Sequence, residues 1–533
     1  MIVEFDVVVD VDPGALEAGD CQAGLWLTIN TSPAPPIPMQ LPIRIDDSAP
    51  ASLQVQIAQE IRELILRGKL SPGARMPASR ELAADLSVSR NTVVGAFERL
   101  MSEGLLEARE PTGTFVAQRF WTEAKTSVVA GRSTSGVWPL KRGIEHLQFH
   151  AEPHIVVAPF GQRLPFDFWV GRPDARLFPI RIWQSLLSRM LRGASHQLSE
   201  YGDPQGLPAL REAIAHHVGA SRGIATDASR ILVTNGIQEG LNLLGRLLMA
   251  TGVQVVVENP CYSGASRVFA QHGVHLRPVA VDGDGMDPAQ LSHAAAVAYV
   301  TPSHQYPLGS SLSLPRREAL LAWAETCGAY VAEDDYDSDF FYDGTPLPAL
   351  KSLDRDDRVV YLGTFSKSLG AGLRIGYMIL PAELCTPARN AKAMLNNCQP
   401  WLEQAALAAF ISEGRYAEHL RRLRRMYAAR RNHLCATMAH HLPDWQVQGS
   451  GAAMHAVIHL PVGGIDAQTV ERAARAHGVG VYGLDNGNAE WFGPDPHDLR
   501  RRILLFGYAA LNESEISDAL LRVRDAVAEM QSR

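Results

Sequence analysis

Short apolar runs rich in β-branched residues alternate with helical stretches from about residue 165 to the end of the chain. Five of these runs are predicted to be buried strands: 231–234, 253–258, 296–301, 330–334 and 359–363. Helical segments such as 237–249 and 316–327 lie between them. Strands that alternate with helices predict a parallel sheet with helices packed on it, which is an α/β fold. The stretch 467–533 is expected to form part of a smaller lobe.

The length and charge of the chain allow a second kind of domain. The chain has 533 residues, well above a typical domain of about 150 residues. Its 50 Lys and Arg residues and 57 Asp and Glu residues give a net charge of −7. This balance excludes a protein coated with basic residues for binding nucleic acid. It does not exclude a small DNA-binding module within a larger neutral body.

The ends and the cysteines give further expectations. Residues 1–40 contain acidic residues and prolines but no Lys or Arg, which predicts a disordered acidic extension. No apolar run reaches the roughly 18 residues of a membrane helix, and the start lacks the pattern of a secretory signal. The six cysteines form no Cys-x-x-Cys pair. We therefore expect no metal site, no membrane partner and a cytoplasmic location.

The block 41–120 has the pattern of a winged helix-turn-helix. Helical spacing predicts helices at 53–67, 78–86 and 90–101, and a β-hairpin with Gly113 at its tip follows at 107–116. The third helix opens with Ser89, Arg90, Asn91 and Thr92, side chains that suit phosphates and base edges in the major groove. A three-helix packing motif that binds no DNA remains the alternative, because this pattern alone is common.

A second set of residues points to an aldehyde cofactor. In the run 361–376, YLGTFSKSLGAGLRIG, Lys367 lies among small residues, where a lysine can form a Schiff base. Thr364, Ser366 and Arg374 offer hydroxyls and a guanidinium for a phosphate. Asp334 follows an apolar strand and can face a pyridine nitrogen, and Tyr336 can reach a phenolic oxygen. A solvated lysine and a solvated acidic turn are the alternatives for these two motifs.

Weaker signals flank this set. Asn235, Gly236 and Ile237 link a predicted strand to a helix, so their backbone amides could seat a phosphate. Tyr262, in a turn, offers an aromatic ring for stacking, although a lone Tyr in a turn is more often structural. Tyr201 precedes a predicted helix, where it could equally belong to a simple helix start.

The first block resembles the winged helix-turn-helix of the GntR family. The resemblance rests on the runs PASRELA (77–83), VSRNTV (88–93), EGLLE (103–107) and GTFV (113–116). It implies double-stranded operator DNA as a partner. The DNA contacts that it implies are Arg80, Ser89, Arg90, Asn91, Thr92, Gly113 and Thr114.

The part from about residue 165 resembles the fold-type I aminotransferases, which use pyridoxal 5′-phosphate (PLP). By this resemblance Lys367 is the catalytic lysine that forms the internal aldimine, Asp334 pairs with the pyridine nitrogen and Tyr336 with the phenolic oxygen. Tyr262 would stack on the ring, and Tyr201 would reach the phosphate in the neighbouring subunit. Arg502 lines up with the arginine that holds a substrate carboxylate. The residues expected around the phosphate are Asn235, Gly236, Ile237, Thr364, Ser366 and Arg374.

The run HQYPLG at 304–309, in which Tyr306 replaces an expected Asn, resembles the MocR subfamily of GntR regulators, which includes GabR. The resemblance implies a multi-domain chain with an extension at 1–40, a winged helix-turn-helix (α+β) at 41–120, a linker at 121–164 and an aminotransferase-like α/β domain of two lobes at 165–533. It implies a PLP-dependent transcriptional regulator that forms a head-to-tail homodimer and senses an amino compound by external aldimine formation. A working aminotransferase with a DNA-binding domain, or a DNA binder with a vestigial pocket, remains the alternative.

Overall fold

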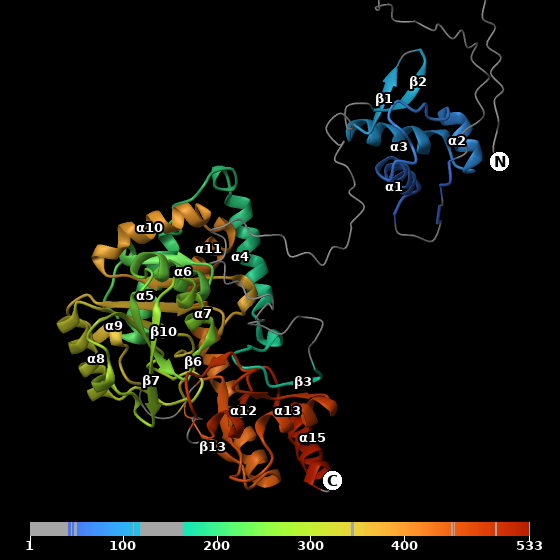
Figure 1. Ribbon diagram of the computed structural model, residues 1–533. Helices are drawn as coiled ribbons and strands as arrows, with labels where there is room; N and C mark the ends of the chain where they lie inside the picture. Colours follow the sequence, from blue (N-terminus) through green and yellow to red (C-terminus); the bar gives the residue numbers. More distant parts are fainter. Residues whose placement is uncertain are drawn as a thin grey trace, which may run out of the picture. The chain divides into compact units, whose positions relative to one another are not determined.

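The computed structural model describes residues 41–43, 45–46, 51–109, 111–117, 164–342, 346–448, 451, 453–495 and 498–531. The chain divides into two units, residues 1–144 and 145–533 (Figure 1). The extension at 1–40 and the linker at 121–164, apart from Leu164, lie outside the described residues. In the described part of the chain, no helix is long and apolar enough to span a membrane.

The smaller unit has the predicted three helices and hairpin. Its elements are α1 (Leu53–Leu66), α2 (Ser79–Asp85), α3 (Arg90–Ser102), β1 (Leu106–Arg109) and β2 (Gly113–Val116). Apolar side chains of all three helices, such as Ile61, Leu82 and Phe97, form one buried core. Each predicted helix boundary lies within one residue of the observed one, because turns and a helix cap mark these ends in the sequence.

The larger unit contains an eight-stranded sheet and a four-stranded sheet. The large sheet has the order β4-β12-β11-β10-β9-β5-β7-β8. Its strands are β4 (Ile231–Thr234), β5 (Gln254–Asn259), β7 (His275–Asp282), β8 (Gly285–Met286), β9 (Ala295–Val300), β10 (Tyr330–Asp335), β11 (Val359–Thr364) and β12 (Gly376–Ile379). The five predicted strands are therefore confirmed.

The large sheet is mixed, whereas the sequence predicts a parallel one. Strand β12 runs antiparallel to both β11 and β4, and β8 runs antiparallel to β7. A parallel crossover needs a connection of about a dozen or more residues, usually an α-helix. The loop between β11 and β12 contains only a short 3-10 turn at Ala371–Leu373, so the chain returns in the opposite direction.

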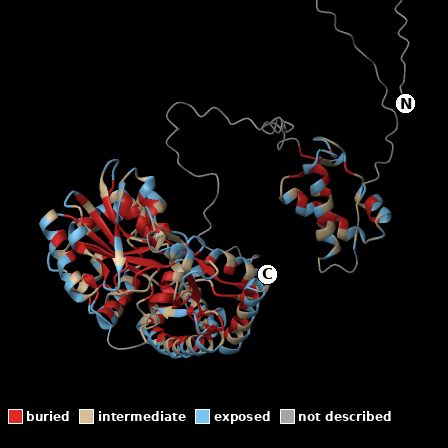
Figure 2. Cartoon of the chain, turned by 60° about the horizontal axis from the view of Figure 1, so that its bottom comes forward, coloured by how far each residue is buried: buried red, intermediate tan, exposed pale blue. Residues whose placement is uncertain are grey.

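Helices cover both faces of the large sheet (Figure 1). Alternation along β4 shows the two layers: Ile231 and Val233 pack with one group of helices, and Leu232 packs with the other. Most strands of the large sheet are buried, whereas β7 is largely exposed, and exposed residues lie on the outer sides of the helices (Figure 2). The helices of this part are α4 (Ile180–Gly193), α5 (Pro208–Arg222), α6 (Ile237–Leu248), α7 (Ser263–Gln271), α8 (Leu314–Cys327), α9 (Leu350–Leu353), α10 (Ala382–Asn396) and α11 (Trp401–Ser412).

The stretch 467–533 forms part of a smaller lobe, as predicted, and residues before it complete that lobe. Its sheet has the order β13-β14-β18-β16, and a buried cluster joins this sheet to the long helices. Because β13 and β14 precede residue 467, the lobe begins earlier in the chain. Its elements are α12 (Arg415–His441), β13 (Gln446–Gln448), β14 (His455–His459), α13 (Ala467–Ala476), β16 (Tyr482–Gly483), α14 (Leu499–Arg502), β18 (Ile503–Gly507) and α15 (Glu513–Gln531).

Two-residue strands complete the larger unit. Strand β3 (Phe166–Asp167) pairs with β15 (Val479–Gly480). The start of the larger unit is thereby held against the smaller lobe. Strand β6 (Cys261–Tyr262) pairs with β17 (Ala489–Glu490), which joins the edge of the large sheet to the smaller lobe.

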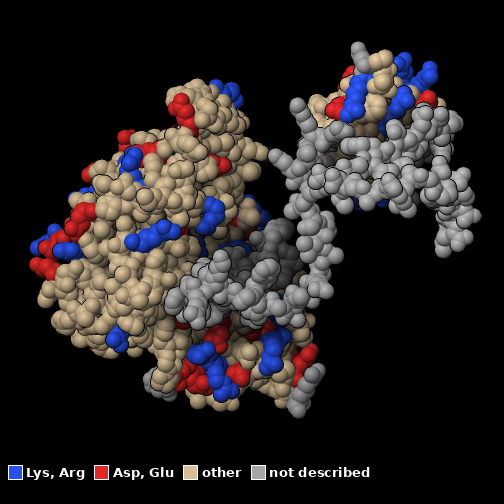
Figure 3. Space-filling view, turned by 45° about the horizontal axis from the view of Figure 1, so that its top comes forward, with Lys and Arg blue, Asp and Glu red and all other residues tan. Residues whose placement is uncertain are grey.

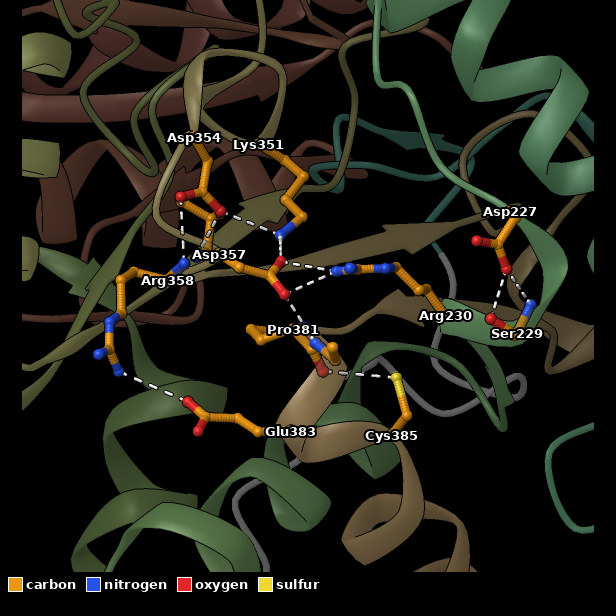
Figure 4. Close-up of polar contacts among 12 residues, drawn as sticks. Asp227, Ser229, Arg230, Lys351, Asp354, Asp357, Arg358, Pro381, Glu383 and Cys385 are labelled. Atoms are coloured by element: carbon orange, nitrogen blue, oxygen red, sulfur yellow. Dashed lines mark hydrogen bonds and ion pairs between the residues drawn. The ribbon is translucent and has the colours of Figure 1, made fainter.

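An ion-pair network holds the edge of the large sheet at which β4 and β11 begin (Figure 4). Arg230 Nη1 lies 2.7 Å from both carboxylate oxygens of Asp357. Lys351 Nζ donates to Asp357 at 3.0 Å, and the backbone N–H of Ala382 donates to it at 2.7 Å. Burial raises the pKa of Asp357, but these hydrogen bonds outweigh it and lower the pKa to about 2. Asp357 therefore joins three segments as a carboxylate.

We expect Asp357→Asn to lower the free energy of unfolding of the larger unit by about 1–2 kcal/mol, because charge-assisted hydrogen bonds are lost at a partly exposed site. Asn also tolerates the positive φ of 55° at this position. The ionised carboxylate stabilises the fold above the ordinary pKa of 3.8. The difference in free energy of unfolding between wild type and Asp357→Asn should therefore become smaller as the pH falls from about 4 to about 2. Thermal unfolding across this range measures it, and the exposed neighbour Asp356→Asn is the control. Equal stability of Asp357→Asn and wild type at neutral pH would contradict this account.

Candidate functional site

The carboxyl ends of β4, β10 and β11 lie at one edge of the large sheet, and a cavity of about 950 Å³ opens there. Ligands of α/β proteins usually bind outside these strand ends. Of the predicted cofactor residues, those that line this cavity are Ile237, Tyr262, Asp334, Tyr336, Thr364, Ser366, Lys367 and Arg374. Sequence positions far apart are thus brought to one place.

Lys367 lies just beyond β11, inside the cavity. Its Nζ donates to the backbone oxygen of Gly171 at 3.3 Å. Burial lowers the pKa of this amine, and the charges of Asp337 and Asp334 oppose that shift in part. A lowered pKa increases the neutral fraction of a lysine, and only the neutral amine attacks a carbonyl. The site therefore suits Lys367 for bonding to an aldehyde.

Only one of the two carboxylate oxygens of Asp334 has a hydrogen-bond partner among the described residues. Its Oδ2 accepts a hydrogen bond from Tyr299 Oη at 2.7 Å. Its Oδ1 is buried and has no partner among the described residues. Burial raises the pKa of Asp334 to about 7, although the Tyr299 hydroxyl and the Lys367 charge lower it. A protonated ring nitrogen beside Oδ1 would satisfy this oxygen and keep the carboxylate ionised, so the site fits the pyridine ring of PLP.

Residues that are expected around a phosphate lie near the start of α6. Arg374 Nη2 donates to the backbone oxygen of Asn235 at 2.6 Å. Gly236 has a φ of +75°, and a Cβ there would lie 3.0 Å from Arg374 Nη2, so a side chain would crowd the guanidinium. Asn235 and Gly236 themselves do not line the cavity. On its other side, the hydroxyl of Thr364 accepts from the backbone N–H of Ser366 at 3.1 Å.

Three tyrosines surround the space between these groups. The Tyr336 hydroxyl lies 3.0 Å from His304 Nδ1. The rings of Tyr262 and Tyr336 both meet that of Tyr306 edge to face, with centroids 6.0 Å apart. Tyr306 donates its hydroxyl to the backbone oxygen of Gly487. Tyr306, which replaces an expected Asn, is therefore in the cavity, but its hydroxyl is engaged elsewhere.

Two predicted residues are not brought into the cavity of their own chain. Tyr201 is 83% exposed. The expectation for Arg502 needs correction, because its guanidinium donates to the backbone oxygen of Leu460 at 3.2 Å. Arg502 precedes β18, whereas Gly507 at the other end of β18 contacts the segment beside the cavity. Five residues of strand separate these two by about 16 Å.

Other residues line the cavity that were not predicted from the sequence. The segment 169–175, after β3, forms one wall, and His455 and Asn488 from the smaller lobe lie on the wall as well. Burial and the nearby His304 lower the pKa of His455 to about 3, so this imidazole is neutral. The run Gly171-Arg172-Pro173-Asp174 is a turn signal, and it was the available clue to this wall.

In the smaller unit, the predicted DNA contacts lie on α2, at the start of α3 and at the hairpin tip. Ser89 caps α3 and accepts from the backbone N–H of Thr92 at 3.2 Å. Arg80, Arg90 and Asn91 are exposed. The structure records no ion pair for either arginine within the described residues. Lys and Arg side chains appear on the visible surface of this unit, with acidic side chains among them (Figure 3).

The tip of the hairpin lies beside a further arginine, Arg75. Gly113 is exposed at its tip with a φ of +118°, and a Cβ there would lie 3.5 Å from Arg75 Nε. The backbone oxygen of Thr114 accepts from Met76 at 2.8 Å, which ties the hairpin to the segment before α2. A wing held in this way can follow a DNA backbone.

Comparison with known proteins matches both units. Residues 53–116 match the family "Bacterial regulatory proteins, gntR family", and residues 173–485 match "Aminotransferase class I and II". The probable rhizopine catabolism regulatory protein MocR of Rhizobium meliloti is 33% identical over 92% of this chain and 96% of its own length. The pyridoxine biosynthesis regulator PdxR of Corynebacterium glutamicum is 32% identical over 90% and 98%.

A solved enzyme structure is similar to the larger unit. The Pyrococcus horikoshii kynurenine aminotransferase superposes with a TM-score of 0.61 and 26% identity, over 68% of this chain and 91% of the enzyme. Its fold is that of an enzyme that uses PLP, which implies PLP use here. The relatives that span nearly the whole chain are transcriptional regulators. The chain therefore belongs to the MocR/GabR subfamily of GntR-family transcriptional regulators.

Proposed function

We propose that this regulator binds PLP through Lys367 and senses a primary amine at the same cavity, and that this binding changes how it contacts operator DNA. The observation that carries the proposal is the pairing of a buried lysine of lowered pKa with an aspartate whose Oδ1 has no partner among the described residues. Lys367 suits an aldehyde and Asp334 a ring nitrogen. The same chain contains a winged helix-turn-helix, so binding at that cavity can act on transcription.

Each group in the cavity has a separate part in this proposal. PLP, when bound, supplies an aldehyde that exchanges between amines and a protonated ring that withdraws electrons. Lys367 would hold that aldehyde, and Asp334 would hold the ring proton. Tyr336 would donate to the ring oxygen, and Tyr262 would cover the ring. The phosphate would lie against Arg374, Thr364, Ser366 and the backbone amide of Ile237. Asn235, whose backbone N–H donates to Glu239 at 2.6 Å, and Gly236 would support this seat from outside the cavity.

The smaller unit would read the operator. The exposed side chains of Arg80, Arg90 and Asn91 can fork onto base edges or phosphates. Ser89 and Thr92, at the start of α3, lie where a helix N-terminus attracts phosphate. The wing residues Gly113 and Thr114 would follow the adjacent backbone.

A head-to-tail homodimer would complete the site. Tyr201 is 83% exposed, and Met394, on the neighbouring helix α10, is 88% exposed. Gly202 donates to Cys398 Sγ at 3.3 Å, so the loop of Tyr201 and the loop after α10 lie together. Exposed apolar side chains on adjoining segments suit an interface between copies. Tyr201 would then contact the phosphate in the partner's cavity.

Titration of the PLP-loaded full chain with primary amines tests the proposal. With PLP added, the full chain should turn yellow, and titration with primary amines should shift its visible absorption. Amines that shift the absorption should change operator binding over the same concentration range. Steady conversion of an amino acid and a keto acid at enzymatic turnover, with operator binding unaltered, would instead support a working aminotransferase. A chain that stays colourless with PLP would overturn the proposal.

A further inference from the structure

The cavity around Lys367 contains a second arginine besides the one placed for the phosphate. Among the described residues that line it, arginine occurs at two positions, Arg172 and Arg374. Arg374 lies against Asn235 at the start of α6. Arg172 lies in the wall formed by the segment 169–175, next in sequence to Gly171, whose backbone oxygen accepts from Lys367 Nζ. In the sequence, Arg172 therefore directly follows the residue that the Lys367 amine contacts.

Arg172 is held firmly by one nitrogen and left unsatisfied at another. Its Nη1 donates to Asp167 Oδ2 at 2.7 Å, and the other oxygen of Asp167 accepts from Tyr482 Oη at 2.7 Å. The Arg172 side chain is only 15% exposed. Its Nη2 is buried and has no hydrogen-bond partner among the described residues. A buried donor of a charged group that has no partner costs free energy. An acceptor bound at this nitrogen would therefore stabilise the site.

The carboxylates of the cavity wall do not supply that acceptor. Asp174 is occupied by Arg176 at 2.8 Å and by Arg430 at 2.9 Å. Asp334 belongs to the ring-nitrogen position described above. Burial raises the pKa of Asp337 well above its usual range, so this group favours its neutral form. The charge of Arg172 is therefore offset on one side only, by Asp167.

We infer that Arg172 binds an oxyanion, such as a carboxylate, on the amino compound that the cavity senses. The inference rests on the proposed function and adds a class of effector: a primary amine that also carries an anionic group. Arginine matches an oxyanion by a planar pair of donors. Asp167 and Tyr482 act as positioning residues, because they hold the guanidinium against the wall. Arg172 takes the part that the sequence assigns to Arg502.

The test compares acids with amines that lack the acid. The probes are β-alanine against ethylamine and 4-aminobutyrate against propylamine, titrated into the full chain with PLP and followed by visible absorption. Wild type should prefer at least one acid over its matched amine by about 10-fold to 100-fold in half-saturating concentration, as expected for a charge-assisted hydrogen bond. Arg172→Gln should reduce this preference to about 3-fold or less, with the amine values unchanged.

Two further variants separate binding from folding. Arg172→Lys keeps a charge for Asp167 but lacks the second Nη group, so its preference should be intermediate. Arg502→Gln is the matched control, since Arg502 lies outside the cavity, and it should keep the wild-type preference. An unchanged preference in Arg172→Gln, or a loss in Arg502→Gln instead, would overturn the inference while leaving the proposed function standing. Absence of any amine-dependent shift in wild type would overturn both.

Discussion

Lys367→Ala is expected to abolish covalent capture of PLP completely. Lys367 is the lysine that lines the cavity in the described part of the chain, and its amine donates to the backbone oxygen of Gly171. Without it, borohydride should fix no cofactor on the protein, whereas in wild type the adduct should map to the peptide that contains Lys367. Mass spectrometry after borohydride treatment measures this directly.

The control for this experiment is Lys69→Ala, in the smaller unit, which should leave the visible absorption and the adduct unchanged. Far-UV circular dichroism should be the same for all three proteins, since the cavity tolerates a smaller side chain. A covalent adduct on another lysine in Lys367→Ala, at the yield seen in wild type, would show that the cofactor is held elsewhere.

Arg90→Ala is expected to weaken operator binding by about 1–3 kcal/mol, which corresponds to a loss of roughly 5-fold to 150-fold in affinity. Arg90 is exposed at the first position of α3, directly after the Ser89 cap. If its guanidinium reads a base, the loss should fall on specific DNA and relax specificity. If it contacts a phosphate, specific and random duplexes should lose affinity alike.

Fluorescence anisotropy with a selected operator and a random duplex, at fixed salt, measures both losses. Arg99→Ala is the matched control, because Arg99 lies near the other end of α3 and pairs with Glu103 at 3.4 Å. It should change binding little. Wild-type affinity of Arg90→Ala for both duplexes would contradict the placement of the DNA contact on α3.

Local signals in the sequence were sufficient for the elements and for most of the cavity. The buried strands could be predicted because their apolar runs are short and are bounded by turns, and β4 begins and ends at the predicted residues. The resemblance to fold-type I aminotransferases predicts that Asp334 and Lys367 share one site, and the parallel strands β10 and β11 bring them to one edge of the sheet. Their register confirms this, since Asp334 is paired with Leu362 on β11.

Features set by tertiary contacts could not be predicted in this way. The direction of β12 depends on how the loop after Lys367 returns, and no periodicity encodes that. The resemblance assigns a substrate carboxylate to Arg502, but the tertiary fold turns its guanidinium to the backbone oxygen of Leu460. Arg172 lines the cavity because β3 pairs with β15, a contact between residues about 300 positions apart in the sequence.

The central claim is that an amine bound at Lys367 changes the affinity for DNA. A ligand shifts a conformational equilibrium only by its differential affinity for the two states. The direct test is operator affinity of the PLP-loaded full chain, measured with and without an amine that shifts its absorption, in wild type and in Lys367→Ala. We predict a change in wild type and none in Lys367→Ala. An equal change in both proteins would contradict the claim, because the amine would then act at a site other than Lys367.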